Sequence, residues 1–337
     1  MTALTAPATA PRTSGGPRLT VWLLRLHRPA LYTWVLFVLL AAALLLALRG
    51  PLADAAADGW RHFDACQDYS TCRYDQNAIL RYKDGYDYAT VALSALPLAV
   101  AAWAGAALVG RELESGTATL TWSQAVSPAR WLTLRLAVPA LAVTAGSGLL
   151  VLLHHLAWSA GRGRIFTAKP WYDTWTFHAN GPTTVALALA GLAAGAFAGL
   201  LWRRALPALV LALLFTAALR ALVEKVMPHL WPAVTTVGSL RQGAPGWGVY
   251  VDEGLVTSTG AHVPRPPCYS SAECGAAYAR LDVVGNYHTF HPYSHYWPLQ
   301  LTTTAALLAV TGLLVTAAFL VLRRRTGALR TAPEASA

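Results

Sequence analysis

Residues 110–135 read GRELESGTATLTWSQAVSPARWLTLR, and the interpretation of the rest of the chain depends on this stretch. It carries charged residues in a compact pattern, whereas the runs on either side of it, 101–109 and 136–158, carry none. A short charged stretch between two long apolar runs is typical of a loop that joins two membrane spans. We therefore expect this loop to lie on one face of a bilayer, where it can contact a soluble partner.

The composition is that of a membrane protein. Of the 337 residues, 55% are hydrophobic and 12% are charged, whereas a soluble domain has about 25% charged residues. A hydrocarbon core about 30 Å thick requires roughly 20 largely apolar residues of helix. Six runs meet this requirement, namely Leu31–Leu48, Ala89–Val109, Leu132–Trp158, Thr183–Leu201, Ala205–Val223 and Trp297–Leu322. The predicted fold class is an all-α integral membrane protein with six transmembrane helices.

The distribution of charge predicts the orientation of these spans. Six spans place both termini on one side, and lysine and arginine are enriched in the cytoplasmic loops of membrane proteins. The segments on the side of the termini hold thirteen lysines and arginines but only three acids, whereas the opposite loops hold twelve cations and thirteen acids. We therefore expect both termini to be cytoplasmic, and we attribute the net charge of +10 to topology and not to nucleic-acid binding.

This layout divides the chain into three parts. Residues 1–20 are rich in Thr, Ala, Pro and Gly and lack an apolar run, which predicts a disordered N-terminus. Residues 21–325 form the six-helix domain, and residues 326–337 form a short cytoplasmic tail. The expected extracytoplasmic loops are 49–88, 159–182 and 224–296, and the expected cytoplasmic loop between the second and third spans is 110–131.

The fifth run is the least secure span because it contains Arg220. Glu224 follows four residues later, so the two side chains can pair on one helix face near the water boundary. The fourth run carries Gly191, Gly195 and Gly199 at a spacing of four residues, which leaves a flat groove where another helix can approach closely. A neighbouring span and a second copy of the chain are both possible occupants of that groove.

The four cysteines form two pairs with the same spacing, Cys66 with Cys72 and Cys268 with Cys274, in two of the expected outer loops. An oxidising exterior favours two local disulfides at these positions. A metal site is the weaker interpretation because the spacing is wider than that of a zinc knuckle. Two disulfides leave no free thiol for catalysis.

Two groups of histidines are candidate functional sites. His154 and His155 lie near the outer end of the third run, and ionisable residues inside a membrane are functional candidates. Adjacent residues of a helix point about 100° apart, so this pair cannot easily share a metal, and an interfacial polar pair is the better interpretation.

His288, His291 and His295 form the second group, and three histidines could bind zinc or copper. Pro292 disfavours a helical spacing through them. The neighbouring Tyr293, Tyr296 and Trp297 favour an aromatic belt at the outer interface instead.

Several enzyme motifs are absent from the sequence. It contains no G-x-x-x-x-G-K-[ST] phosphate loop, G-x-S-x-G elbow, H-E-x-x-H helix or G-x-G-x-x-G turn. The apolar runs also lack the paired carboxylates that a proton relay requires. We therefore expect no catalytic residue, metal site or cofactor in this chain, and any work done across the membrane must draw on a partner.

The loop resembles the connection between the second and third spans of type-2 ATP-binding-cassette (ABC) transporter permeases. In that family an R-E-x-E-x-G-T run closes the second span and an S/T-x-x-R segment opens the third. This chain has Arg111–Thr117 and Ser127–Arg130 at these places. Residues 292–300 are also similar to the start of that family's sixth span, where Arg is more usual than His295. The excess of arginine, 23 Arg to 3 Lys, fits the variant of GC-rich bacteria.

The resemblance implies a function and a set of partners. It implies an export permease for a hydrophobic or amphipathic substrate in the bacterial plasma membrane, acting as a homodimer or with a similar permease. Cytoplasmic ABC ATPase subunits would bind the ATP and Mg²⁺. The implied ATPase-coupling residues are Arg111, Glu112, Glu114, Gly116, Thr117 and Arg130. The alternatives are a permease-like ligand sensor or immunity component, an integral membrane enzyme that uses the histidines, and an ordinary inner loop.

Overall fold

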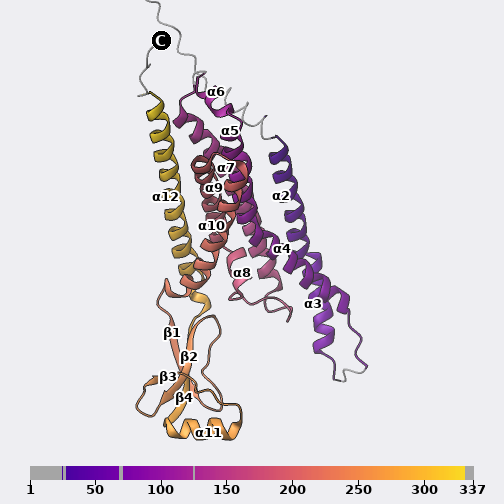
Figure 1. The fold of residues 1–337 in the computed structure, drawn as a ribbon. Coiled ribbons are helices and arrows are strands. Elements are labelled where there is room, and N and C mark those ends of the chain that lie inside the picture. The colour runs from indigo at the N-terminus through magenta and orange to yellow at the C-terminus, as the bar shows by residue number, and fades with distance from the viewer. Residues whose placement is uncertain (1–24, 26–27, 68–70, 124–125, 331–337) are drawn as a thin grey trace, which may run out of the picture.

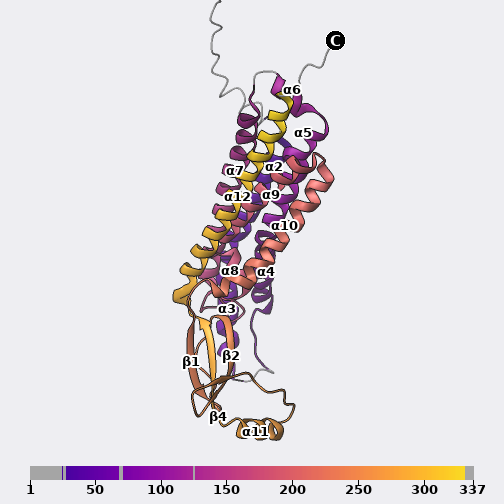
Figure 2. The same ribbon diagram turned by 60° about the vertical axis from the view of Figure 1, so that its left-hand side comes forward.

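The computed structural model describes residues 25, 28–67, 71–123 and 126–330. These residues form a long bundle of helices with a small β-sheet at one end, as Figures 1 and 2 show. The predicted disordered segment 1–20 lies outside the described residues, and so do residues 331–337 of the predicted tail. Residues 326–330 of that tail continue the last helix.

The six predicted spans are confirmed as helices that are long and apolar enough to cross a membrane. Each predicted run lies within one helical segment of the structure. The segments are α2 (Arg28–Arg49), α4 (Gln76–Trp103) with the π-helix η1 (Ala104–Gly110), α7 (Pro128–Gly161), α9 (Thr183–Trp202), α10 (Ala205–Val226) and α12 (Tyr296–Arg330).

Helix α9 is the central helix of the bundle. It is built mainly of Ala, Gly and Leu, most of its residues are buried, and it packs against α4, η1, α7, α10 and α12. A β-carbon added at Gly195 would lie 2.6 Å from the backbone nitrogen of Gly105, and one added at Gly199 would lie 2.9 Å from that of Gly110. A β-carbon added at Gly191 would lie similarly close to the carbonyl oxygen of Pro97. The glycine groove therefore holds the second span of the same chain.

The second span changes from an α-helix to the π-helix η1 before it reaches the 110–135 stretch. A β-carbon at Gly105 would lie 2.6 Å from the carbonyl oxygen of Ala208, so η1 contacts α10 as closely as it contacts α9. Short π-helical segments are frequent at functional sites. Here the segment lies directly before the charged loop, and its backbone is fixed between two other spans.

The turn between α9 and α10 is short. Helix α9 ends at Trp202, and Arg203 adopts a left-handed backbone conformation with φ of 54° while its N–H donates to the carbonyl of Gly199 at 2.9 Å. A left-handed residue that bonds back to the last turn is a common way to end a helix. The two spans are therefore an antiparallel hairpin.

Most of the predicted outer loop 49–88 is helical in the structure. After Gly50 the chain continues as α3 (Pro51–Asp64), and α4 begins at Gln76, where the Asp75 side chain caps it by accepting from the N–H of Ala78 at 2.9 Å. The charges in this segment mark the end of the apolar run, but alanine-rich sequence still favours helix beyond it. Cys66 and Cys72 are bonded in the connection between the two helices, with their Cα atoms 5.8 Å apart.

The all-α prediction was wrong for the segment 224–296. After α10 and the 3₁₀ turn η2 (Met227–His229), the chain forms an antiparallel sheet with the strand order β1-β4-β2-β3. The strands are β1 (Val234–Ser239), β2 (Val249–Thr257), β3 (His262–Val263) and β4 (Val283–His291), with α11 (Ser271–Arg280) before β4. The segment holds seven prolines, but its Val, Thr and Tyr residues favour strands. Cys268 and Cys274 are bonded at the start of α11.

Candidate coupling site and its surroundings

The predicted coupling loop consists of two short helices, α5 (Arg111–Glu114) and α6 (Thr117–Ser123). Gly116 separates them with φ of 73°, a left-handed conformation that glycine adopts without strain. The hydroxyl of Thr117 donates to the carbonyl of Glu112 at 3.2 Å across this turn. The structure therefore places a break between two short helices at Gly116 and Thr117. Residues 124–125 of the loop lie outside the described part of the chain.

Glu112 points inward and forms an ion pair with Arg135 of α7. The side chain of Arg135 is 1% exposed and that of Glu112 is 14% exposed, so the pair is buried. The carboxylate of Glu112 is therefore engaged with its own chain, and its implied role in ATPase coupling stays a prediction. Arg135 was not among the site residues expected from the sequence.

Glu114 fastens the loop to a different helix. Its Oε2 accepts a hydrogen bond of 2.9 Å from the N–H of Ala205, the first residue of α10. The residue at the N-cap of α10, Arg204, makes no capping hydrogen bond through its side chain. Because the first N–H groups of a helix lack partners within the helix, a carboxylate there supplies an acceptor and complements the helix dipole.

The loop is thus attached to three spans by different means. It continues from η1 through the backbone, it is tied to α7 by the Glu112–Arg135 pair, and it is tied to α10 by Glu114. Arg111 and Arg130, by contrast, are exposed, and Ser127 caps α7 by accepting from the N–H of Arg130 at 3.3 Å. The loop is therefore held to three spans, while its two arginines face outward.

His154 belongs to a buried polar cluster far from this loop. Its side chain is inaccessible, with Nε2 lying 2.9 Å from the hydroxyl of Thr90 and Nδ1 lying 2.5 Å from Oδ1 of Asn180. His155 is half-buried and packs against Trp158 and Tyr296. His154 is therefore a buried link between α7 and α4, and the interfacial position of the pair stays a prediction.

Two further polar residues of the last span join the same region. The side-chain amide of Gln300 accepts from the hydroxyl of Thr183 at 2.5 Å and donates to the carbonyl of Phe177 in α8 (Thr174–Ala179) at 2.6 Å. The hydroxyl of Tyr296 donates to the carbonyl of Asn180 at 2.8 Å. A glutamine inside an apolar run was the only signal in the sequence for these contacts, since buried polar groups require partners.

The second histidine group does not converge on one point. His291 lies with its Nδ1 3.1 Å from that of His295 and with its Nε2 2.8 Å from the carbonyl oxygen of Pro228, while His288 packs on Phe290. Burial lowers the pKa of His291, and its bond to the Pro228 carbonyl opposes that shift. Among the described residues, no group of three or more His, Cys, Asp or Glu side chains could hold a metal ion.

The predicted pair within the fifth span is present. Arg220 donates through Nε to Glu224 at 3.0 Å, and its Nη1 also donates to the carbonyl of Ser94 in α4 at 2.7 Å. Its guanidinium lies 4.7 Å from the ring centre of Trp175. These contacts give the charged guanidinium of Arg220 partners inside an apolar helix. The presence of Arg220 therefore does not prevent α10 from being a span.

A family model described as "ABC-2 membrane transporter related" matches residues 35–227. The matched region runs from within α2 to the end of α10, and it includes the charged loop with both of its attachments. The chain belongs to this family. This ABC-2 protein is therefore a multi-pass permease of a membrane transport system, and its family implies association with an ABC ATPase. The match ends before the β-sheet. No curated protein and no solved structure matches the chain.

Proposed function

We propose that this ABC-2 permease is the membrane subunit of an exporter that moves a hydrophobic or amphipathic substrate across the bacterial plasma membrane. A separate ATPase subunit, which holds the ATP and Mg²⁺, docks on the loop 110–131. The observation that carries this proposal is the attachment of Glu112 to α7 and of Glu114 to α10. A loop joined to three spans gives an external motor a rigid connection to the bundle.

The proposed roles of the coupling residues differ with their exposure. Arg111 and Arg130 are exposed and offer guanidinium groups to carboxylates of the ATPase. Glu112 and Glu114 hold the loop in place, and Gly116 with Thr117 sets the angle between α5 and α6. Only the first pair contacts the partner, whereas the others position the surface that it binds.

The end of the bundle that carries this loop is the proposed cytoplasmic end. The loop, the turn between α9 and α10 and the end of α12 gather there, and the sheet lies at the opposite end (Figure 1). Arg325 near the end of α12 donates to the carbonyl of Leu200 at 2.7 Å. The cationic end of α12 therefore packs against α9. Both bonded cysteine pairs lie away from this end, as an oxidising exterior requires.

The proposed transport unit contains two permeases, two copies of this chain or one copy with a similar protein. Helices α2, α10 and α12 are the least buried spans, and they expose large apolar side chains such as Leu36, Leu214 and Leu313. Membrane lipid and a second permease can both cover such surfaces.

We expect charge reversal at the exposed arginines to weaken binding of the ATPase. Arg111→Glu with Arg130→Glu places two acids where the partner meets two cations, and repulsion at such sites weakens association by about tenfold or more. The measurement is the amount of ATPase subunit that co-purifies with the full chain from its host membranes, together with the ATP hydrolysis rate. Arg73→Glu is the matched control, because Arg73 is exposed at the opposite end. Unchanged co-purification of the double variant contradicts the docking surface.

Thiol labelling tests the proposed orientation. In intact cells, a membrane-impermeant maleimide is expected to label none of the four cysteines until a reductant opens the Cys66–Cys72 and Cys268–Cys274 bonds. After reduction all four react, because both pairs face the exterior. A cysteine introduced at the exposed Thr119 is the control, since it reacts only in permeabilised cells. Labelling of that cysteine in intact cells overturns the orientation.

A ligand sensor is the second candidate function, and the folded outer sheet favours it. Trp247 and Tyr269 are 81% and 95% exposed there, which provides aromatic surface for a ligand. The test is to remove residues 234–291 and to measure whether a transported compound still stimulates ATP hydrolysis. Retained stimulation favours the exporter. Loss of all stimulation with a stable helical bundle favours the sensor.

A further inference from the structure

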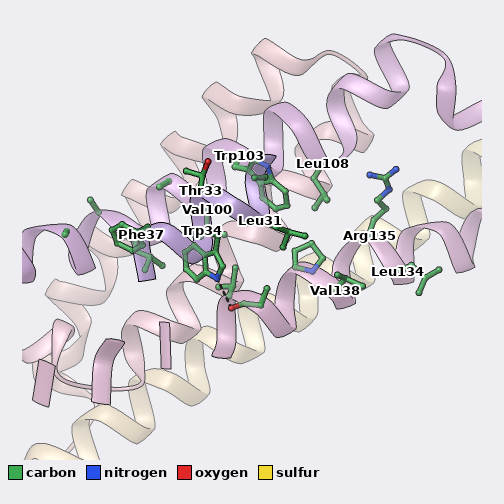
Figure 3. Close-up of a pocket in the computed structure, with 18 residues that line it drawn as sticks. Leu31, Thr33, Trp34, Phe37, Val100, Trp103, Leu108, Leu134, Arg135 and Val138 are labelled. Atoms are coloured by element: carbon green, nitrogen blue, oxygen red, sulfur yellow. Dashed lines mark hydrogen bonds between the residues drawn. The ribbon is translucent and has the colours of Figure 1, made fainter. Parts of the chain in front are cut away.

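An apolar cavity of about 540 Å³ lies between α2, α4 and α7, within the membrane-spanning part of the bundle (Figure 3). Its walls include Trp34 and Phe37 of α2, Ala95 and Ala99 of α4 and Val138 of α7. This volume is within the range of about 300–1,000 Å³ found for small-molecule sites in proteins. The cavity lies outside the coupling loop, and the proposed function does not use it.

The cavity exists because α2 touches its neighbours at only some levels. At Trp34 it meets α7, where a β-carbon on Gly146 would lie 2.6 Å from the indole ring and Nε1 donates to the carbonyl of Ala142 at 3.2 Å. Near its end it meets α4, where Leu48 packs over Gly85. Closer to the start of α2, the side chains of Ala95 and Ala99 on α4 remain exposed. Two small residues there leave space that no side chain of α2 fills.

The lining of the cavity selects an apolar occupant. Among its lining residues, Arg135 alone is charged, and Glu112 balances that charge. The hydroxyl of Thr33 already donates to the carbonyl of Pro29 at 2.9 Å. Water needs two to four polar partners to occupy a site stably, and this lining does not supply them. An empty cavity forfeits dispersion contacts, so a flexible hydrocarbon chain is the occupant that the site favours.

Two exposed arginines lie close in sequence to lining residues at one end of the cavity. Arg28 begins α2 two residues before the lining residue Ala30, and Arg130 lies in the first turn of α7, four residues before the lining residue Leu134. Both arginines are exposed. The described acids at this end, Glu112 and Glu114, are engaged with Arg135 and with the N–H of Ala205. Basic mouths of pockets between membrane helices bind anionic lipid head groups.

We propose that this cavity is a binding site for one anionic phospholipid. One acyl chain lies against Ala95, Ala99 and Trp34, and the phosphate lies between Arg28 and Arg130. The site requires only that the chain lies in a bilayer. It shares Arg130 with the proposed ATPase surface, so lipid binding is measured with the permease alone, without the ATPase. Its occupancy supports α2 along the stretch where α4 does not contact it.

Photo-labelling of the full-length protein in lipid nanodiscs tests this site directly. The probe is phosphatidylglycerol with a diazirine on one acyl chain, and phosphatidylcholine with the same chains is the neutral competitor. We expect cross-links to concentrate on residues 30–37, 92–103 and 134–143. We also expect unlabelled phosphatidylglycerol to compete at least tenfold better than phosphatidylcholine. Each arginine near an anionic head group raises the binding affinity about fivefold.

Three variants separate the two parts of the site. Ala99→Phe fills the cavity and is expected to reduce labelling by both lipids more than tenfold. Arg28→Gln with Arg130→Gln leaves the cavity open, so labelling continues while most of the preference for phosphatidylglycerol is lost. Leu141→Phe is the control, because Leu141 lies on the same helix α7, is 72% exposed and does not line the cavity.

Three results overturn the proposal. The first is a spread of cross-links over the whole surface of the bundle in the wild-type protein, which needs no variant to fold. The second is equal competition by the two lipids. The third is a change of oligomeric state in Ala99→Phe without a change in lipid labelling, since a second copy of the chain would then be the occupant of the cavity.

Discussion

Replacing Glu112 with alanine is expected to destabilise the protein by about 3–5 kcal/mol. The substitution leaves Arg135 as a charge that is 1% exposed, with its acidic partner removed. The cost arises because a buried charge loses the carboxylate that balances it, and it exceeds what the pair contributes relative to two apolar residues. The measurement is thermal unfolding of the full chain in detergent. Its readout is the fraction of protein that remains monodisperse after heating.

Exchanging the two charges distinguishes positioning from docking. Glu112→Arg with Arg135→Glu restores an ion pair, so we expect it to regain much of the lost stability and also ATPase co-purification. Recovered stability without recovered co-purification would show that Glu112 itself contacts the ATPase, against the geometry found here. Glu114→Gln is the control, because the amide oxygen still accepts from Ala205 N–H and the change is expected to cost about 1 kcal/mol.

Replacing Gly195 with leucine is expected to cost about 3 kcal/mol or more, or to prevent assembly of the bundle. Even a β-carbon at this position would lie 2.6 Å from the nitrogen of Gly105 and 2.7 Å from the β-carbon of Ala104. The obstacle is backbone, which cannot rotate away as a side chain can. Helix α9 must therefore separate from η1, and the coupling loop moves with η1. Unfolding in detergent and ATPase co-purification both report this change.

Gly148 of α7 is the matched control for that substitution. It is a glycine inside a membrane span, but a β-carbon there meets no atom within 4 Å. Gly148→Leu is expected to be neutral or to stabilise the helix by up to about 1 kcal/mol, because glycine is a poor helix former. Equal destabilisation by both substitutions would show that the groove of α9 is not tightly packed.

Only part of the candidate site can be read from the sequence. The loop 110–131 and its two glutamates are visible there, because charged residues between apolar runs stand out. The directions of those glutamates were not visible, since Arg135 is 23 residues from Glu112 and Ala205 is 91 residues from Glu114. Ion pairs between spans depend on helix rotation and packing, and local periodicity does not fix either. The residues left for a partner were therefore identified only after the internal pairs were known.

The sequence by itself determined the membrane spans, the pairing of the cysteines and the charged end of the bundle. These features follow from local properties, namely the length of an apolar run, the spacing of cysteines and the positions of arginines. Tertiary structure alone decided that the groove of Gly191, Gly195 and Gly199 holds η1, that His154 is a buried link, and that residues 234–291 form a sheet. Each of these depends on which distant segments meet, and that is set by the packing of the whole chain.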